Sequence, residues 1–347
     1  MLTEIKPQQD LWSLLKEETR PIVVYGMGNG ADKLFERLAT IGKTPSAVFA
    51  SDDFVRGQVF RGFRVQRFSE IKASYPSFVV LVSFGSRLPS VMDAVYQMAE
   101  NYPVFLPDMP VAGDAYFDLD FATAHAGDLQ KAYDLLEDKL SKKIFADVIL
   151  YKITGDVRYL KDAHSSDEEE LACLQGRDIR VAIDGGAYNG DTARKLVANH
   201  AGLVRIYAVE PDPKNHKKLE KFAAECENCK IFPIHAALWE SCGEKQFNAG
   251  GNRNSSLVSA SYENKGVSTR LLTVDEIAAN DRVDLIKYDV EGVEKEAILG
   301  SRSTILRDRP ILAVSVYHRS EDIFELPLLL ENMCRGSPPF QRPPHRT

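Results

Sequence analysis

The sequence predicts an α/β protein with two units of alternating strands and helices, each built around a parallel sheet. Short runs rich in valine and isoleucine, such as IVVY, FVVLV and VAI, alternate with amphipathic stretches of helical length. This pattern is typical of strands that are buried on both faces. The length of 347 residues corresponds to about two domains of roughly 150 residues each, which excludes a single small module.

The composition narrows the class of protein. Hydrophobic residues make up 44% and charged residues 27% of the chain, as in soluble globular proteins. The formal net charge of −7 argues against nucleic acid as the main partner, because phosphate-binding surfaces are basic. No apolar run approaches the roughly 20 residues that span a bilayer, and the beginning of the chain lacks the apolar segment of a secretory signal. Five cysteines without framework spacing fit free thiols, so we expect a cytoplasmic protein.

The first unit is predicted to be a Rossmann-like domain over residues 1–112. A strand, a glycine turn with a helix, and a second strand follow each other in PIVVYG, MGNGADKLFERLATIG and SAVFASDD. FVVLVSFGS predicts a further strand, followed by a helix over 89–100 and a strand over 104–106. Prolines and a glycine over 107–113 end the pattern.

The glycine turn of this unit allows two interpretations. GMGNGA matches G-x-G-x-x-A between a strand and a helix, and Asp52 and Asp53 follow the next strand, as in dinucleotide-binding folds. The alternative is a turn that only packs a strand against a helix, because nothing downstream resembles hydride-transfer machinery. A nucleotide or nucleotide-sugar would bind at Gly26, Gly28 and Gly30.

Residues 113–178 are predicted to form a helical connector. Apolar residues from Leu129 to Leu140 recur at helical spacing and predict one helix, and a second helix is expected from Ile144 to Lys152.

The second unit is predicted over residues 179–335. In open parallel sheets ligands bind outside the carboxyl ends of the strands, so candidate residues should directly follow strands. Strands are expected over 179–183, 206–210, 230–234, 283–290 and 311–316. Helices are expected over 192–199, 214–225, 291–299 and 322–333, and extra strands and polar loops over 245–273.

The segment VAIDGGAYNGDTAR is the sharpest motif of the second unit. It places Asp184 at a strand end, followed by a glycine turn and a helix start. Glycines let a ligand approach the backbone, and a helix N-terminus attracts a carboxylate or phosphate. Glu210, in AVEPD at the end of the next strand, can accept both hydroxyls of a ribose. The motif therefore predicts a nucleoside-containing cofactor.

The residue types favour S-adenosylmethionine over NAD. Asp184 stands where the dinucleotide fingerprint has its first glycine. A carboxylate at that point suits a cofactor with an ammonium and a sulfonium better than one with a pyrophosphate.

Four motifs together resemble the FkbM family of S-adenosylmethionine-dependent methyltransferases. They are IDGGAYNGDT, AVEPDP, LLTVDEI and LIKYDVEGVEKEAILG, and the resemblance covers roughly residues 179–330. It implies a class I methyltransferase fold and methyl transfer to a hydroxyl of a sugar or natural product. The cofactor-binding residues that it implies, with the adjoining turn and helix start, are Asp184, Gly185, Gly186, Gly190, Asp191, Thr192 and Glu210.

The candidate catalytic residues are Asp289, Glu291 and His318. Asp289 and Glu291 are two apart at a strand end and are expected to project to one face. A hydroxyl acceptor needs a base, and we expect Asp289 or His318, which follows the next strand, to supply it. The alternatives are that Glu291 is a first-turn helix acid and that His318 is a structural polar residue at a strand end.

No metal site is predicted. Cys226 and Cys229 form a single C-x-x-C near His216 and His235, which is too little for a zinc site. The polar loop 248–256 is expected either to face the substrate or to be an ordinary flexible hairpin.

The C-terminal residues 336–347, GSPPFQRPPHRT, are predicted to be a disordered proline-rich tail. Class I methyltransferases normally close their sheet with a hairpin at this place. The sequence departs from that pattern. Either the end of the chain is altered or shortened, or the hairpin is absent by design. In both cases we expect two sheet strands and part of the wall of the acceptor site to differ from the usual fold.

The sequence thus predicts an S-adenosylmethionine-dependent O-methyltransferase without a membrane span, acting on a sugar, a glycan precursor or another small natural product. The alternative is a non-catalytic nucleotide-sugar-binding protein with a degenerate or truncated methyltransferase domain. An NAD-dependent oxidoreductase is a third, weaker hypothesis.

Overall fold

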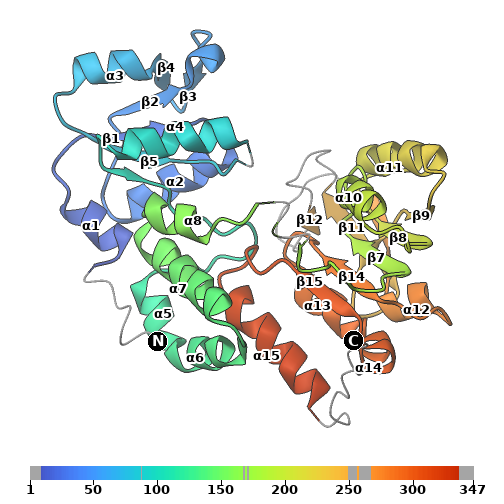
Figure 1. Cartoon of the computed structure of the whole chain (residues 1–347). Coiled ribbons are helices and arrows are strands. Elements are labelled where there is room, and N and C mark those ends of the chain that lie inside the picture. The colour runs from blue at the N-terminus through green and yellow to red at the C-terminus, as the bar shows by residue number, and fades with distance from the viewer. Residues whose placement is uncertain are drawn as a thin grey trace. The chain divides into compact units, whose positions relative to one another are not determined.

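Two units make up the part of the chain that a computed structural model describes, namely residues 9–86, 88–166, 169, 172–248, 256–257 and 267–335 (Figure 1). The first unit contains the described residues up to Pro110 and from Asp114 to Ser165. The second contains Val111–Gly113 and the chain that follows Ser165. Both are mixed α/β units with parallel sheets, which confirms that part of the predicted fold class.

The sheet of the first unit has the order β3-β4-β2-β1-β5-β6. Its strands are parallel except β3, which pairs antiparallel with β4. Buried side chains of α1 and α2 pack on one face, and those of α3, α4 and the later helix α8 (Val157–Ala163) pack on the other. The strands are β1 (Ile22–Tyr25), β2 (Ala47–Ala50), β3 (Val59–Phe60), β4 (Phe63–Arg67), β5 (Val79–Val82) and β6 (Val104–Phe105). The helices are α1 (Leu11–Glu17), α2 (Asn29–Thr40), η1 (Asp52–Phe54), α3 (Phe68–Ser74) and α4 (Pro89–Ala99).

Four helices follow within the first unit. The single helix predicted from Leu129 to Leu140 is wrong, because the backbone of Leu136 is extended and ends α6. Asp138 then caps α7 by accepting a hydrogen bond from the Ser141 amide at 2.8 Å, as N-cap residues do. The helices are α5 (Leu119–Ala124), α6 (Ala126–Leu135), α7 (Lys139–Thr154) and α8 (Val157–Ala163).

The main sheet of the second unit has the order β15-β14-β7-β8-β9, and all its strands are parallel. Buried residues of α10 and α11 pack on one face, and those of α12 to α15 pack on the other. The strands are β7 (Val181–Gly185), β8 (Arg205–Val209), β9 (Lys230–Ile234), β14 (Leu285–Tyr288) and β15 (Ile311–Val314). The helices are α10 (Asp191–Asn199), α11 (Pro213–Glu225), α12 (Val274–Ala278), α13 (Glu294–Leu299), α14 (Arg302–Asp308) and α15 (Asp322–Cys334).

A smaller sheet occupies the region where extra strands were expected. Its order is β10-β13-β11-β12. Residues 249–255 of the predicted polar loop 248–256, and the tail 336–347, lie outside the described residues. The strands of this smaller sheet are β10 (Ala237–Leu238), β11 (Gly243–Asn248), β12 (Ser256–Leu257) and β13 (Val267–Leu272).

The chain order locates the switch point of the main sheet between β7 and β14. From β7 the chain builds outward through β8 and β9, and it then returns to the other side of β7 with β14 and β15. Loops therefore leave β7 and β14 in opposite directions, which is where open α/β sheets bind ligands.

Two predicted boundaries near the switch point are wrong. β7 extends to Gly185, so Asp184 belongs to the strand and not to the loop. The helix expected over 291–299 begins only at Glu294, because Glu291 and Gly292 have φ values of 59° and 93°, which are incompatible with a right-handed helix.

Within the described ranges, the structure contains no helix with the length and apolarity needed to cross a membrane.

Candidate functional site

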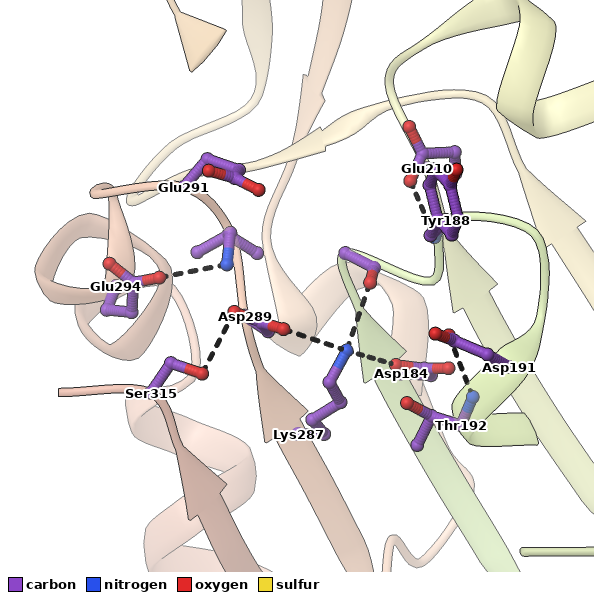
Figure 2. A network of polar contacts seen from close by, with 12 residues as sticks. Asp184, Tyr188, Asp191, Thr192, Glu210, Lys287, Asp289, Glu291, Glu294 and Ser315 are labelled. Atoms are coloured by element: carbon purple, nitrogen blue, oxygen red, sulfur yellow. Dashed lines mark hydrogen bonds and ion pairs between the residues drawn. The ribbon is translucent and has the colours of Figure 1, made fainter. Parts of the chain in front are cut away.

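The switch point brings Lys287 and Asp184 together. They are partners in the register of β14 and β7, and Lys287 Nζ lies 3.1 Å from Asp184 Oδ1 (Figure 2). The same ammonium donates to the Gly186 carbonyl at 3.0 Å and lies 3.9 Å from Asp289 Oδ2. One cation thus ties the end of β7, the glycine turn and the end of β14 together.

Burial and mutual attraction shift the pKa values of both members of this ion pair. Burial raises the pKa of the Asp184 carboxyl, and the nearby Lys287 ammonium opposes that rise. Burial also disfavours charge on Lys287, yet the carboxylates of Asp184 and Asp289 raise its pKa above the ordinary value. Lys287 therefore stays an ammonium and cannot act as a base near neutral pH.

The glycines of the predicted cofactor turn have packing neighbours within the chain. A Cβ at Gly186 would lie 1.9 Å from the Asp289 carbonyl oxygen, and φ there is +76°. A Cβ at Gly190, where φ is +84°, would lie 2.6 Å from the Phe222 ring. At Gly185 it would lie 2.6 Å from Leu238. Packing alone therefore requires these three glycines, and close approach of a ligand remains a prediction.

The helix start after the turn lies beside Asp184. Gly190 is the N-cap of α10 and has no side chain to satisfy the first amides. Asp191 Oδ1 accepts the Thr192 amide at 2.9 Å, and both residues lie next to Asp184 in Figure 2. The predicted residues from Asp184 to Thr192 are thus adjacent in space as well as in sequence.

Glu210 is a buried carboxylate at the end of β8. Its side chain accepts the backbone amide of Tyr188 at 2.7 Å (Figure 2). It also accepts the backbone amide of Asp212 at 2.8 Å. Burial raises its pKa to about 7, although these two amides oppose the rise. Each carboxylate oxygen has room for a further donor, so Glu210 suits a ligand that brings hydroxyls.

Asp289 follows β14 and is held by several polar groups. Its Oδ1 accepts the hydroxyls of Ser315 and Tyr317, each at 2.9 Å. Burial alone disfavours ionisation, but Lys287, His318 and the two hydroxyls lower the pKa of Asp289 below its ordinary value. The carboxyl is therefore ionised and firmly placed.

Glu291 is not a first-turn helix acid, so that alternative is wrong. It precedes α13 in a left-handed conformation, and Glu294 takes the first helical position. Glu294 is buried and accepts the amides of Val290 at 2.9 Å and Gly292 at 3.1 Å. These two hydrogen bonds hold the tight turn that presents Glu291.

His318 lies beside Asp289 and Glu291, the two carboxylates that were predicted to project to one face. Its Nε2 lies 3.6 Å from Asp289 Oδ1 and 3.7 Å from Glu291 Oε2. On the other side of the ring, Nδ1 lies 2.9 Å from Glu294 Oε1. The structure therefore brings all three predicted catalytic residues together.

The glycine turn of the first unit is also explained largely by packing. A Cβ at Gly26 would lie 2.6 Å from Ser83 Oγ, and one at Gly30 would lie 2.1 Å from the Ser83 carbonyl oxygen. Gly28 has open space instead, with φ at +148°. Asp52 and Asp53 are exposed in η1.

The C-x-x-C lies close in sequence to two stacked histidines. Cys226 and Cys229 are free thiols, and the rings of His216 and His235 stack at 4.8 Å. Among the residues that the structure describes, no group of three His, Cys, Asp or Glu side chains is arranged to hold a metal ion.

Sequence reasoning assigned no role to five residues that build this site. Lys287 and Glu294 belong to the quoted block KYDVEGVE, so their position in the motif was a usable signal. Ser315 and Tyr317 precede His318 and could have been found as alternate positions beyond β15. The backbone amide of Tyr188 carried no signal in the sequence.

Comparison with known proteins gives a family and a fold. Residues 184–334 match the model of the methyltransferase FkbM domain. A crystal structure of methyltransferase FkbM from Methylobacillus flagellatus KT is similar to this chain with a TM-score of 0.64 and 18% sequence identity. The likeness covers 96% of this chain and 87% of that chain, and at this identity it concerns the fold. No curated protein matches the chain.

The matched range contains the switch point, Glu210, and the cluster of His318 with Asp289, Glu291 and Glu294. This range nearly coincides with residues 179–330, over which the motifs resemble the same family. The resemblance read from the sequence is confirmed for this range: residues 184–334 match the methyltransferase FkbM domain.

Proposed function

We propose that the chain is an S-adenosylmethionine-dependent O-methyltransferase with a class I fold. The observation that carries the proposal is Glu210, a buried carboxylate beside the glycine turn that accepts only backbone amides among the contacts described. A buried carboxylate whose pKa is raised to about 7 gains most from new donors such as the two hydroxyls of a ribose.

The residues near the switch point fit the other polar groups of this cofactor. Neither carboxylate oxygen of the buried Asp184 has a hydrogen-bond partner among the described side chains, apart from the ion pair with Lys287. Buried acceptors of this kind are normally satisfied, and a ligand ammonium would satisfy one. The start of α10 offers amides to a carboxylate. Asp184, Gly186, Asp191 and Glu210 would therefore hold the cofactor.

When bound, S-adenosylmethionine would supply a methyl group that its sulfonium activates, because the sulfur leaves as a neutral thioether. The protein then has to orient an acceptor hydroxyl in line with the S–C bond and take its proton. Asp289 and Glu291 place carboxylate oxygens at the end of β14, next to the turn that would hold the cofactor. When the acceptor oxygen takes the methyl group, Asp289 or Glu291 would accept the hydroxyl proton, and the S–C bonding electrons would stay with the cofactor's sulfur.

A sugar or another polyhydroxylated molecule suits the acceptor side. Carboxylates accept hydrogen bonds from hydroxyls, and the side chains of Asp289 and Glu291 are 24% and 27% exposed. Tyr317, which is 47% exposed, offers an aromatic surface next to them. The free state of all five cysteines supports the proposed cytoplasmic location.

Calorimetric titration with S-adenosylmethionine and S-adenosylhomocysteine tests the cofactor. We expect saturable binding by the wild type, and roughly 100-fold weaker binding after Glu210→Ala, because two charge-assisted hydrogen bonds are lost. Glu225→Ala, an exposed position at the end of α11, is the matched control. Absence of binding by the intact chain would overturn the proposal.

Release of S-adenosylhomocysteine in the presence of candidate sugars tests the reaction. Asp289→Asn should lower kcat by 10² to 10⁴, the range for a lost proton acceptor, while cofactor affinity changes little. Conversely, an Asp289→Asn variant with full activity would remove Asp289 from the mechanism.

A second candidate, a nucleotide or nucleotide-sugar site at Gly26, Gly28 and Gly30, is favoured by the open space around Gly28. Titration with uridine diphosphate glucose tests it, and Gly28→Val should abolish any binding. Binding of that ligand with no methyl transfer to any acceptor would favour the non-catalytic alternative. We expect no NADH binding in a fluorescence titration.

A further inference from the structure

The imidazole of His318 is enclosed by acidic groups from two directions. Glu294, from α13, faces Nδ1 at 2.9 Å. Asp289 and Glu291, from the turn after β14, face Nε2 at 3.6 and 3.7 Å. Further out stand Lys287, beyond Asp289, and Asp322 of α15, which is close enough to sense the charge on Glu294. Arg319 donates to the Gly292 carbonyl at 2.8 Å and so brings a second cation to the same turn.

The carboxylates of Asp289 and Glu291 are more exposed to solvent than the His318 ring. The side chains of His318 and Glu294 are 0% exposed, whereas those of Asp289 and Glu291 are 24% and 27% exposed. The centroid of the Tyr317 ring lies 4.1 Å from the centroid of the imidazole ring. A molecule that reaches this site from solvent therefore meets the two carboxylates before it meets the ring.

The backbone around the ring is also fixed. The His318 carbonyl accepts the amides of Val111 at 3.1 Å and Ala112 at 2.9 Å. A Cβ at Gly292 would lie 2.4 Å from Ala112 Cβ, so the turn after β14 packs directly against this segment. The backbone that carries the imidazole is therefore held on two sides.

We propose that His318 is a buried cation that positions Asp289 and Glu291 and balances their negative charges, with Glu294 as its counter-ion. On this proposal, His318 is not the group that takes the acceptor's proton. An imidazolium has no free lone pair to receive a proton. His318 is therefore a positioning residue, and the proton goes to a carboxylate in front of it. The assignment rests on the proposed function where it concerns methyl transfer.

The electrostatics of the cluster agree with this assignment. Burial by itself lowers the pKa of His318, but Glu294, Glu291 and Asp289 outweigh it and raise the pKa above the ordinary value of 6.5. Without the imidazolium, three carboxylates would lie around one neutral group, and their negative charges would repel one another without compensation.

The charge state of the ring can be measured without any activity. Nitrogen NMR of the full chain, with ¹⁵N-labelled histidine and the His318 signals assigned by their loss in His318→Gln, distinguishes an imidazolium from a neutral ring. We expect both ring nitrogens to carry protons at pH 7. In Glu294→Gln the ring should lose its proton at a lower pH than in the wild type. A neutral His318 at pH 7 would overturn the proposal, whatever the chain's activity.

The pH dependence of kcat/KM tests the consequence for catalysis. His318→Gln should move the acidic limb upward by about one pH unit, the lower end of the effect of a neighbouring charge, and activity should recover at higher pH. His318→Lys, which keeps a cation but no imidazole, should restore the wild-type limb. His164→Gln, in the first unit, is the control, and thermal melting checks folding. A 10²-fold or larger loss at every pH in folded His318→Gln and His318→Lys would identify His318 as the proton acceptor instead.

Discussion

The two glycine turns of this molecule share a backbone pattern but differ in the side chains around them. Each follows a central strand of a parallel sheet and leads into a helix. Around Gly185–Gly190 lie the buried charges of Asp184, Lys287 and Glu210. Around Gly26–Gly30 lie neutral groups, such as the Tyr25 and Ser51 hydroxyls at 2.6 Å and Ser83, and the nearby Asp52 and Asp53 are exposed.

This difference shows where function resides in such folds. A parallel sheet with a glycine turn provides a place for a ligand, but the chemistry depends on the groups at that place. Buried charges are costly unless they are paired or used. The glycine turn of the second unit has such charges beside it and the turn of the first unit does not, whereas the buried Lys152 of the first unit is paired with Asp108. Mutations at the two turns should therefore affect the two units differently.

The largest difference should follow from Lys287→Met. It leaves the buried Asp184 without its cation, which we expect to destabilise the second unit by about 3 to 5 kcal/mol. Urea unfolding can report each unit, because Trp12 lies in the first and Trp239 in the second. With single-tryptophan variants, only the Trp239 transition should shift. An equal shift at Trp12 would contradict the idea that the two units differ in this way.

A somewhat smaller effect is expected when alanine replaces one glycine in each turn. Gly186→Ala puts a Cβ 1.9 Å from a backbone carbonyl at positive φ, and overpacking plus strain should cost roughly 3 kcal/mol. Gly28→Ala meets no neighbour, so only backbone strain remains, at roughly 1 to 2 kcal/mol. Urea midpoints of both variants provide the test, and a larger loss at Gly28 would reverse the comparison.

The pH dependence of stability should have opposite signs in the two units. Glu210 and Asp322 have pKa values raised to about 7 from 4.5 and 3.8, so the folded state binds more protons in that interval. The second unit should lose about 1 to 3 kcal/mol as pH rises from 4.5 to 7. Glu18, in the first unit, has a pKa lowered to about 2, chiefly by Arg20, so its contribution disappears as pH falls from 4.5 through 2.

Urea unfolding of the cofactor-free chain at several pH values measures both trends. Glu210→Gln should flatten the Trp239 profile and leave the Trp12 profile unchanged. If the wild-type Trp239 profile rose between pH 4.5 and 7, these two carboxyls would not be the dominant titrating groups.

The smallest effect should come from an exposed ion pair. Lys143 lies 2.6 Å from Asp147 on α7, with its side chain 55% exposed. Lys143→Met should change stability by less than about 0.5 kcal/mol, measured by the Trp12 transition. A loss comparable to that of Lys287→Met would show that burial does not explain the difference between the two ion pairs.

Much of the fold could be predicted because the signals are local. Valine-rich runs coincide with β1, β5 and β7, and the predicted helix over 214–225 agrees with α11 within one residue. Failures occurred where a side chain or an unusual φ interrupts a periodic pattern. Asp138 starts a new helix within an apolar repeat, and the left-handed Glu291 delays α13.

The candidate site could be predicted only in part. Motifs placed Glu210 and Asp289 at strand ends, and both lie there. The partners of these residues come from distant parts of the chain, so no spacing rule identifies them. Glu294 was hidden because its role depends on a turn and on His318, 24 residues later.

Strand periodicity and contiguous motifs are short-range properties, so the two α/β units, their glycine turns and the resemblance of the second unit to FkbM methyltransferases can be recognised in the sequence. Which charges neutralise one another depends on the folded structure. Lys287 meets Asp184 through the register of two strands about one hundred residues apart, and His318 meets Glu294 because β14 and β15 are neighbours. Electrostatic partners are chosen by distance in space, and at such separations only the folded sheet sets that distance.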